Sequence, residues 1–346
     1  MGVVLGRGRD ALGALAMVLA ALLAAVAPAA AQQPSPHAID IPRWFVEGFL
    51  DLREDAAAAD RQGKRLLVYF GQDGCPYCTE LMANNFSQRS IVDKTRRHFD
   101  AIAINLWGDR EVTMADGRTV SEKEFARLMK VQFTPTILFL DREARVVARL
   151  NGYLPPERFS AALDYVAGRL ESRQTLGEYL QAKVKDEASP KLHDEPFLMQ
   201  PPFDLRRKPG GRPLAVLFET RHCKPCDEMH AEGFQRAEVQ AQIERFDIAR
   251  FALTDPREIV TPDGRKTTAQ AWARALGIGY TPSIVFFDAG KGEVFRVEGY
   301  QRPFHLAGSF EYVASGGWRS EPEFQRWLRA KAERLRAAGQ PVDLWR

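Results

Sequence analysis

The chain of 346 residues contains one long internal repeat. When residues 66–153 are laid over residues 214–300, matching residues recur throughout at a spacing of 147 or 148 positions. The matches are two C-x-x-C motifs, the Asp-Gly-Arg turns at 116–118 and 263–265, and the Gly-Tyr pairs at 152–153 and 299–300. A period this long indicates a duplicated domain rather than a solenoid of short repeats. Both copies are therefore expected to adopt the same fold.

The composition is that of folded globular domains. Hydrophobic residues make up 45% of the chain and charged residues 27%, which excludes a disordered or polytopic membrane protein. At roughly 150 residues per domain, the length fits two domains. The formal net charge is +3, from 48 Lys+Arg against 45 Asp+Glu. Because no block of Lys or Arg stands out, nucleic acid is excluded as a partner.

The first 31 residues have the pattern of a secretory signal peptide. Arg7 and Arg9 precede an apolar run over 11–26, and 29–31 supply three alanines as a cleavage site. The run is shorter than the ~20 strongly apolar residues of a membrane span, so cleavage is favoured over an uncleaved anchor. We expect the mature chain in the periplasm of a bacterium, where disulfide chemistry is permitted.

Each copy of the repeat predicts the element order β-α-β-α-β-β-α. The apolar runs at 66–70 and 214–218 are typical of strands that are buried on both faces. Each strand leads into a C-x-x-C motif, at which a helix begins. Later in the first copy, Ser121 and Glu124 predict a capping box at the start of a helix. The sequence therefore predicts an α/β fold in both copies.

The predicted domains span 38–170 and 214–338, with a linker over 171–213. The linker begins with a polar helical piece around 174–185 and continues through segments rich in Pro, Gly and Arg. The last helix, 321–338, carries one apolar stripe on a basic background. A membrane-surface helix is one interpretation, but packing against the second domain is favoured because a single apolar stripe usually serves a core.

All four cysteines lie in the two motifs, Cys75–Cys78 and Cys223–Cys226. A cysteine at the start of a helix lies near unpaired backbone N–H groups and the positive end of the helix dipole, which stabilise a thiolate. Cys75 and Cys223 are therefore predicted to be exposed nucleophiles. Cys78 and Cys226, one turn later, are predicted to attack the mixed disulfide formed with a substrate and to release the reduced product.

Three other interpretations of the cysteines are less favoured. Paired zinc motifs usually have about 15 to 20 residues between them, whereas 144 residues separate Cys78 from Cys223. A structural disulfide across a C-x-x-C motif closes a loop too short to remove much unfolded-state entropy. Binding of Cu(I) by the same thiolates is the third alternative. Redox chemistry is favoured, with no metal and no organic cofactor expected.

The pattern of an apolar strand, a C-x-x-C helix, a Thr-Pro pair before another apolar strand, and Gly-Tyr resembles the thioredoxin superfamily. The resemblance implies two tandem thioredoxin-like domains, each with a mixed central sheet flanked by helices. It also implies cis peptide bonds before Pro135 and Pro282, with both prolines facing the cysteines. The backbone of Thr134 and Thr281 would then pair with an extended substrate strand.

Residues 69–78 and 152–159 are similar to the periplasmic thioredoxins of sulfur-oxidation gene clusters, the SoxW-like subfamily. The resemblance implies protein disulfides or thiols as substrates and a membrane-bound thiol reductase of the periplasm as a partner. One position departs from the superfamily, in which a buried acid stands six residues before the first cysteine. Tyr69 and Leu217 occupy that position here, and Glu219 is a candidate substitute in the second copy only.

The predicted function is that of an exported thiol:disulfide oxidoreductase acting on protein disulfides. A disulfide isomerase or oxidase is the enzymatic alternative, and a protein-binding or copper-carrying module is the non-enzymatic one. His222 and Lys224 flank Cys223 and are expected to lower the pKa of its thiol, so the two centres are expected to differ in reduction potential. The sequence does not fix the oligomeric state, for which a monomer is expected.

Overall fold

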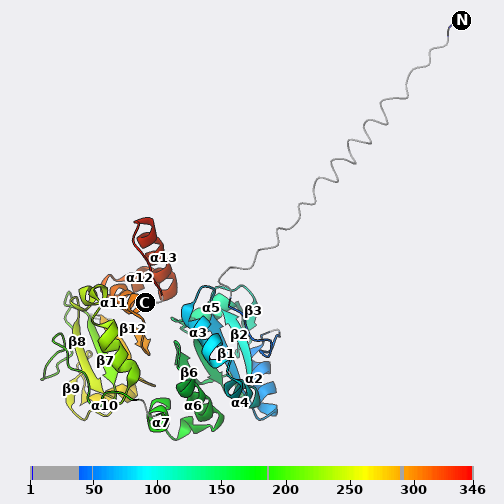
Figure 1. Ribbon diagram of the computed structural model, residues 1–346, viewed down its shortest axis with the longest axis horizontal. Coiled ribbons are helices and arrows are strands. Elements are labelled where there is room, and N and C mark those ends of the chain that lie inside the picture. The colour runs from blue at the N-terminus through cyan, green and yellow to red at the C-terminus, as the bar shows by residue number, and fades with distance from the viewer. Residues whose placement is uncertain (1, 3–38, 49, 185–186, 289–291, 345–346) are drawn as a thin grey trace. The chain divides into compact units, whose positions relative to one another are not determined.

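The computed structural model of the chain describes residues 2, 39–48, 50–184, 187–288 and 292–344 (Figure 1). From Ile39 onward the chain forms one compact unit that holds both copies of the repeat. Except for Gly2, the predicted signal peptide lies outside the described residues, and it stays a prediction. In the described part of the chain, no helix combines the length and apolar character needed to cross a membrane.

The first copy is built around a four-stranded mixed sheet with the order β2-β1-β5-β6. Its elements, in chain order, are α2 (Leu52–Arg61), β1 (Arg65–Gly71), α3 (Pro76–Glu80), η1 (Leu81–Asn85), α4 (Arg89–His98), β2 (Phe99–Asn105), β3 (Glu111–Thr113), β4 (Thr119–Ser121), α5 (Glu122–Leu128), β5 (Thr136–Leu140), β6 (Val146–Asn151), α6 (Pro156–Ala167), η2 (Leu170–Ser172) and α7 (Leu176–Lys183). Strand β1 is parallel to β2 and antiparallel to β5, which is antiparallel to β6.

The second copy repeats this sheet in the order β12-β11-β7-β8. Its elements are β7 (Leu214–Glu219), α8 (Lys224–Glu228), η3 (Met229–Gly233), α9 (Ala237–Ile243), β8 (Asp247–Ala252), β9 (Glu258–Val260), β10 (Lys266–Thr268), α10 (Ala269–Ala275), β11 (Ser283–Asp288), β12 (Gly292–Glu298), α11 (Pro303–Ala314), α12 (Gly317–Ser320) and α13 (Phe324–Ala337). Strand β7 is parallel to β8 and antiparallel to β11. The predicted α/β fold, a mixed sheet flanked by helices in each copy, is confirmed.

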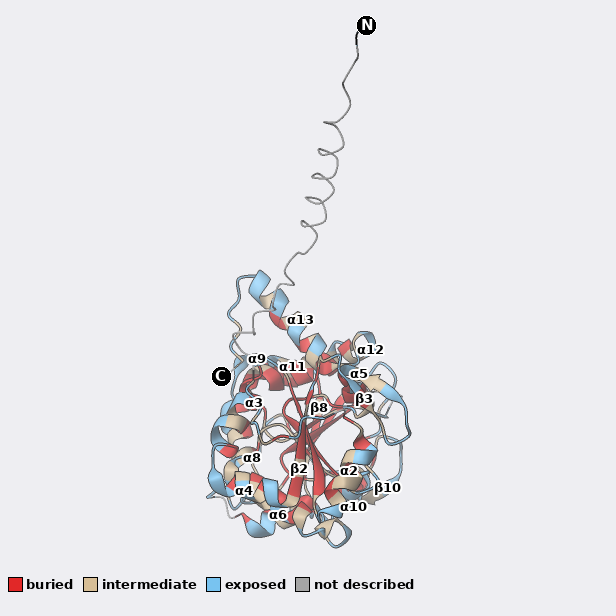
Figure 2. Cartoon of the chain, turned by 90° about the vertical axis from the view of Figure 1, so that its right-hand side faces the viewer, coloured by how far each residue is buried: buried red, intermediate tan, exposed pale blue. Residues whose placement is uncertain are grey.

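Each sheet has a hydrophobic core on both faces, which explains the continuous apolar runs of the central strands. In β1, Leu67 and Tyr69 belong to one core, whereas Val68 and Phe70 belong to the other. Strand β7 divides its residues between two cores in the same way. Successive side chains of a strand point to opposite faces, so a strand covered on both sides is apolar throughout. Figure 2 shows the buried residues concentrated along the strands.

Local details differ from the sequence expectation. Each copy adds a small antiparallel hairpin, β3–β4 or β9–β10, that the predicted element order lacks. Only half of the predicted capping box forms. Ser121 Oγ accepts a hydrogen bond from the backbone N–H of Glu124 (3.4 Å), but the carboxylate of Glu124 pairs with Arg127 (2.5 Å). A nearby arginine therefore competes with the helix N-terminus for this carboxylate.

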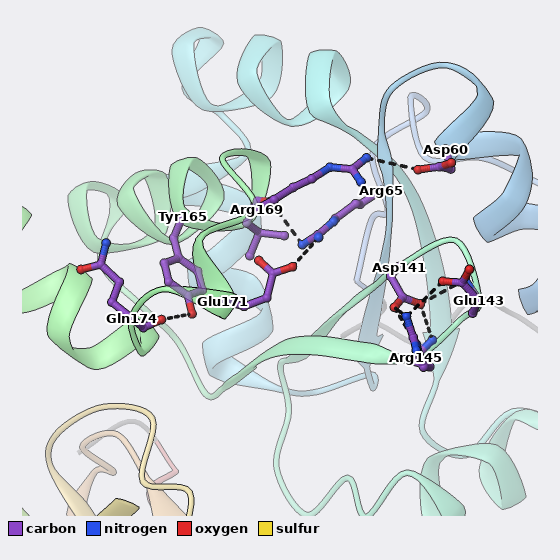
Figure 3. Close-up of polar contacts among 10 residues, drawn as sticks. Asp60, Arg65, Asp141, Glu143, Arg145, Tyr165, Arg169, Glu171 and Gln174 are labelled. Atoms are coloured by element: carbon purple, nitrogen blue, oxygen red, sulfur yellow. Dashed lines mark hydrogen bonds and ion pairs between the residues drawn. The ribbon is translucent and has the colours of Figure 1, made fainter.

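The segment after α6 is anchored to the first copy (Figure 3). Arg65, at the start of β1, forms an ion pair with Glu171. The hydroxyl of Tyr165 donates a hydrogen bond to the carbonyl of Gln174 (2.7 Å). Helix α7 follows, and it lies within residues 174–185, for which the sequence predicts a helix. It begins with a complete capping box formed by Thr175 and Glu178.

The described residues between 187 and 213, within the predicted linker, pack on the second copy. Leu198, Phe203 and Leu205 are buried in its two cores. Helix α13 also packs on the second copy, as its apolar stripe predicts, because Phe324 and Leu328 are buried there. These contacts tie the linker and the C-terminal helix to the same sheet.

The two copies also contact each other through equivalent residues. Phe133 of the first copy is buried in a core of the second, where its ring lies 5.2 Å from that of Phe324. Its counterpart, Tyr280, accepts a hydrogen bond from the backbone N–H of Asn151 (2.8 Å) and donates one to the carbonyl of that residue (2.7 Å). In each copy, the aromatic residue two positions before the proline of the Thr-Pro pair therefore contacts the other copy.

Candidate functional site

Both C-x-x-C motifs lie at the start of a helix, as predicted. Cys75 is the N-cap residue of α3, and its Sγ accepts a hydrogen bond from the backbone N–H of Cys78 (3.1 Å). Cys223 caps α8 in the same way, with Sγ 3.2 Å from the backbone N of Cys226. Each pair forms a disulfide, and the Cα–Cα distances are 5.3 and 5.2 Å. The sulfur of each first cysteine therefore lies at the N-terminal end of a helix and accepts a backbone N–H, a position that favours negative charge.

The expectation that the first cysteines are exposed is wrong. Only 3% of Cys75 and 2% of Cys223 is accessible. The Thr134–Pro135 segment and residues of the second copy cover Cys75, and the Thr281–Pro282 segment covers Cys223. The sequence pattern places a cysteine at a helix start, but it carries no signal for what packs over that position.

Both Thr-Pro pairs lie against the first cysteine of their motif, and both peptide bonds are cis, as the resemblance implies. Thr134 Oγ1 donates a hydrogen bond to Cys75 Sγ (3.3 Å), which also lies 3.4 Å from the Thr134 carbonyl oxygen. Thr281 Oγ1 lies 3.6 Å from Cys223 Sγ. The structure thus brings Cys75, Thr134 and Pro135 together in one copy, and the matching three residues in the other.

Further polar side chains extend each site, and the sequence interpretation missed them. In the first copy, Trp107 Nε1 donates to Gln72 Oε1 (2.5 Å), and Gln72 Nε2 donates to Thr134 Oγ1 (3.1 Å). In the second, Thr220 occupies the position of Gln72 and bonds Thr281 Oγ1 (2.9 Å). Their position could have indicated this role, because Gln72 and Thr220 each stand three residues before the first cysteine of their motif.

The second site contains a buried charged cluster next to its motif. Glu219 is fully buried, and its Oε1 lies 2.7 Å from Nε2 of His230. Nδ1 of His230 lies 2.9 Å from Oε1 of Glu195. Burial alone would lower the pKa of His230, but the hydrogen bonds and charges of the two glutamates raise it above its ordinary value. His230 comes four residues after Cys226. Residues at this spacing lie on the same face of a helix.

The predicted linker completes this cluster. His193 Nε2 lies 2.6 Å from Oδ1 of Asp227, and the two imidazoles of His193 and His230 are stacked with centroids 4.4 Å apart. The backbone N–H of Ser189 donates to Oδ2 of Asp227 (2.8 Å), and its carbonyl accepts from the backbone N–H of His222 (2.8 Å). Because linker residues are distant in sequence from the motif, the motif alone gave no signal for them.

The first copy has a neutral arrangement at the same place. Gly71 stands where the second copy has Glu219, and Met82 stands where it has His230. A side chain at position 71 would collide with the hydroxyl of Tyr69. Burial, with a smaller contribution from the charge of Asp73, raises the pKa of Tyr69, so its phenol stays neutral. The two centres therefore differ in the charge buried beneath them.

A metal centre was among the sequence alternatives. Within the described ranges, no group of three or more His, Cys, Asp or Glu side chains is placed to hold a metal ion. The four sulfurs are instead paired within their motifs. The arrangement is suited to thiol–disulfide exchange, in which each bonded pair receives two electrons and each reduced pair gives them up.

The two disulfides are expected to titrate at different reduction potentials. Exposed Lys224 places a positive charge beside Cys223, which stabilises its thiolate and hence the reduced state. We expect the second centre to be the more oxidising by at least about 30 mV, a tenfold difference in the exchange equilibrium. Redox titration of Cys75→Ser and Cys223→Ser variants measures each centre alone.

Lys224→Gln is the control for this difference, since it removes one charge and leaves the motif cysteines in place. It should lower the potential of the second centre. One common potential for the two single-centre variants would contradict the expectation.

A family model described as a thioredoxin-like domain matches two stretches of the chain, residues 52–167 and 206–314. Each stretch contains one C-x-x-C motif and one Thr-Pro pair. The two stretches correspond to the two copies of the internal repeat, from α2 to α6 and from the residues before β7 to α11.

Similar curated and solved proteins cover smaller parts of the chain. The thiol:disulfide interchange protein DsbD of Pseudoalteromonas atlantica is 27% identical over 123 residues, which are 35% of this chain and 19% of that protein. The chain thus spans about a fifth of that relative's length. A thioredoxin-fold protein from Helicobacter pylori is 23% identical with a TM-score of 0.33, covering 39% of this chain and 96% of that one. A Thermus thermophilus thioredoxin is 27% identical with a TM-score of 0.27, covering 34% and 83%.

Proposed function

This chain belongs to the family of thioredoxin-like domains, and we propose that it is an exported thiol:disulfide oxidoreductase whose two cysteine pairs exchange disulfides with protein substrates. One observation carries the proposal. In each copy a disulfide joins an N-cap cysteine to the cysteine one turn later, and the threonine before a cis-proline contacts the first sulfur. This geometry holds a nucleophile, a resolving thiol and a backbone edge for a substrate together.

The exchange follows from the positions of the sulfurs. In the reduced protein, Cys223 as thiolate attacks one sulfur of a substrate disulfide, forming a mixed disulfide and releasing the other substrate sulfur as a thiolate. Cys226 then attacks Cys223 Sγ, which restores the Cys223–Cys226 bond and releases the second substrate thiol. Two electrons pass from the protein to the substrate. The same steps run in reverse when the bonded pair oxidises a substrate dithiol.

We propose that the buried cluster of the second copy handles the proton of the resolving thiol. Cys226 must lose its proton before it attacks, and it is as deeply buried as Cys223. Glu219, four residues before Cys223, and His230, four residues after Cys226, are buried and share a hydrogen bond, so Glu219 is the carboxylate that we propose as the proton acceptor. In the first copy, the neutral hydroxyl of Tyr69 offers no such acceptor.

The cellular setting belongs to the same proposal. The N-terminal pattern of residues 1–31 supports export to the periplasm, and the sequence around Cys75–Cys78 supports a place among the SoxW-like proteins. The name of the similar DsbD protein, thiol:disulfide interchange protein, supports exchange with protein thiols. A membrane-bound thiol reductase is the partner we propose for the return of electrons.

Removal of the resolving cysteines tests the proposed function. Cys78→Ser and Cys226→Ser should each accumulate a mixed disulfide with a protein substrate such as insulin, because the second attack is lost. Mass spectrometry without reductant identifies the adduct, and its release by dithiothreitol shows that the bond is a disulfide. The matched control is the double variant Cys223→Ser/Cys226→Ser, which removes both sulfurs of one centre. The proposal would be contradicted if neither Cys78→Ser nor Cys226→Ser formed an adduct while the native protein bound Cu(I) stoichiometrically.

A further inference from the structure

A small cavity of about 200 Å³ adjoins the first cysteine motif. Cys75, Tyr77 and Thr134 line it from the first copy, while His305 and Arg329 line it from the second. Ligand pockets for drug-sized molecules measure about 300–1,000 Å³, so this cavity suits a smaller ligand. The nucleophilic residue of one copy thus faces a chamber whose other wall comes from the second copy.

The loop before the first cis-proline is held by helix α13. Gln132 Oε1 accepts a hydrogen bond from the backbone N–H of Phe324 (3.0 Å), and Gln325 Nε2 donates to the carbonyl of Gln132 (3.1 Å). Gln325 Oε1 also accepts from Nε2 of Gln72 (3.2 Å). Phe133 is buried against Phe324 in a core of the second copy. The N-terminal end of α13 therefore lies against the loop beside which an extended substrate would have to align.

A larger cleft reaches both motifs. Tyr77 of the first motif, Pro225 of the second and Thr281 line it, and its volume is about 850 Å³. Lys224 and His222 on either side of Cys223 are exposed. A protein strand requires several residues of free backbone edge, and at the first centre the contacts of α13 with Gln132 restrict that edge.

The cavity at Cys75 also presents polar groups for a ligand. His305 is 8% exposed, and its Nδ1 has no hydrogen-bond partner among the described residues. Burial, together with the charge of Arg302, lowers the pKa of His305 to about 4, so its imidazole is neutral and offers one donor and one acceptor. An unpartnered buried polar atom is costly, and His305 is one of the residues that line the cavity.

Charged side chains at the cavity favour a carboxylate. Arg329 and Arg336 project from the basic helix α13 and line the cavity. Two acids line it as well. Glu298 is already paired with Arg296 (3.6 Å), and Asp73 accepts a hydrogen bond from the backbone N–H of Ile39 (3.3 Å). The guanidinium groups of α13 are thus the part of the lining suited to bind an anionic group.

We propose that this cavity binds a low-molecular-weight disulfide bearing a carboxylate, and that Cys75 and Cys78 exchange disulfides with this molecule faster than with a protein. The inference rests on the proposed function, since it assigns a substrate class to one of the two centres. Cys75 thiolate attacks one sulfur of the small disulfide RSSR, giving Cys75–S–S–R and RS⁻. Cys78 thiolate then attacks Cys75 Sγ and releases the second RS⁻. The cysteine pair is oxidised and RSSR is reduced to two thiols.

The test uses full-length variants that keep a single thiol. Cys78→Ser/Cys223→Ser/Cys226→Ser retains only Cys75, and Cys75→Ser/Cys78→Ser/Cys226→Ser retains only Cys223. The probes are 3,3′-dithiodipropionate, which is anionic, 2-hydroxyethyl disulfide, which is neutral, and insulin. Adduct formation is followed by mass spectrometry. We expect the ratio of the dithiodipropionate rate to the insulin rate to be at least tenfold higher at Cys75 than at Cys223.

Two arginines on α13 provide a matched pair for the charge selectivity. In the Cys75 variant, Arg336→Ala should slow dithiodipropionate at least threefold and change 2-hydroxyethyl disulfide by less than twofold. Arg334→Ala, an exposed residue of the same helix outside the cavity lining, should change neither rate. Equal rate ratios at the two cysteines, or an equal loss for both small probes, would overturn the inference. Failure of insulin to react at Cys223 would instead contradict the proposed function, and the comparison of small probes at Cys75 would still test the cavity.

Discussion

Replacing His230 by alanine is expected to destabilise the second copy by about 3–5 kcal/mol, because removing one partner of a buried ion pair leaves the other charge uncompensated. The side chains of His230 and Glu219 are only 2% and 1% exposed. Without the imidazole, Glu219 keeps its burial and loses its partner, and Glu195 loses the same contact. Hydrogen exchange of the β7 and β8 amides, together with chemical denaturation, measures the loss in the copy where it occurs.

His230→Gln is the matched control, since its amide keeps hydrogen-bonding capacity but does not titrate. The folded-state pKa of His230 lies above its unfolded value, so its contribution to stability is fully present below the unfolded pKa of about 6.5 and is lost as pH rises through the folded pKa. The stability difference between the native protein and His230→Gln should therefore shrink with rising pH. A difference that grows over this range would show that His230 is neutral in the fold.

The repeat and the local motifs predicted most of the architecture. Strand β1 is apolar at nearly every position because both of its faces are covered. The run of apolar residues therefore predicted both the extent of the strand and its burial. Cys75 and Cys223 were placed at helix starts by the same local logic, and the cis-prolines by resemblance. These features depend on residues close in sequence or on a pattern present twice, and that is why one sequence sufficed to find them.

The parts that sequence reasoning missed depend on contacts between distant segments. Glu195 lies 35 positions before His230 and in a segment rich in turn-forming residues, yet it pairs with that imidazole. His305 is one histidine within an apolar helix, and nothing local indicates that it borders Cys75. The burial of both first cysteines has the same origin, since their covering residues come from other loops or from the other copy. Tertiary packing, rather than local propensity, decides all three.

Phe133→Ala is expected to weaken the packing between the two copies more than any other substitution. Phe133 is 6% exposed and packs against Phe295 and Phe324 of the second copy, with ring centroids 5.7 and 5.2 Å away. Truncating a buried phenylalanine to alanine costs about 3–5 kcal/mol, from lost burial and from the cavity that remains. The same change removes the apolar anchor that holds the loop before Pro135 against α13. We therefore expect lower stability and a faster reaction of Cys75 with insulin.

Tyr280→Phe provides the comparison at the equivalent position of the repeat. It removes only the hydroxyl that bonds both backbone groups of Asn151, so it should cost about 1 kcal/mol for each hydrogen bond lost and leave the reaction of Cys75 unchanged. Denaturant unfolding gives the stabilities, and mass spectrometry of the variant that retains only Cys75 gives the insulin reaction. If Phe133→Ala loses stability while Cys75 reacts with insulin no faster than before, then the loop is held by the hydrogen bonds of Gln132 and Gln325. Double substitution of Phe133 and Gln325 would then be needed to open the site, because the two contacts act on the same loop.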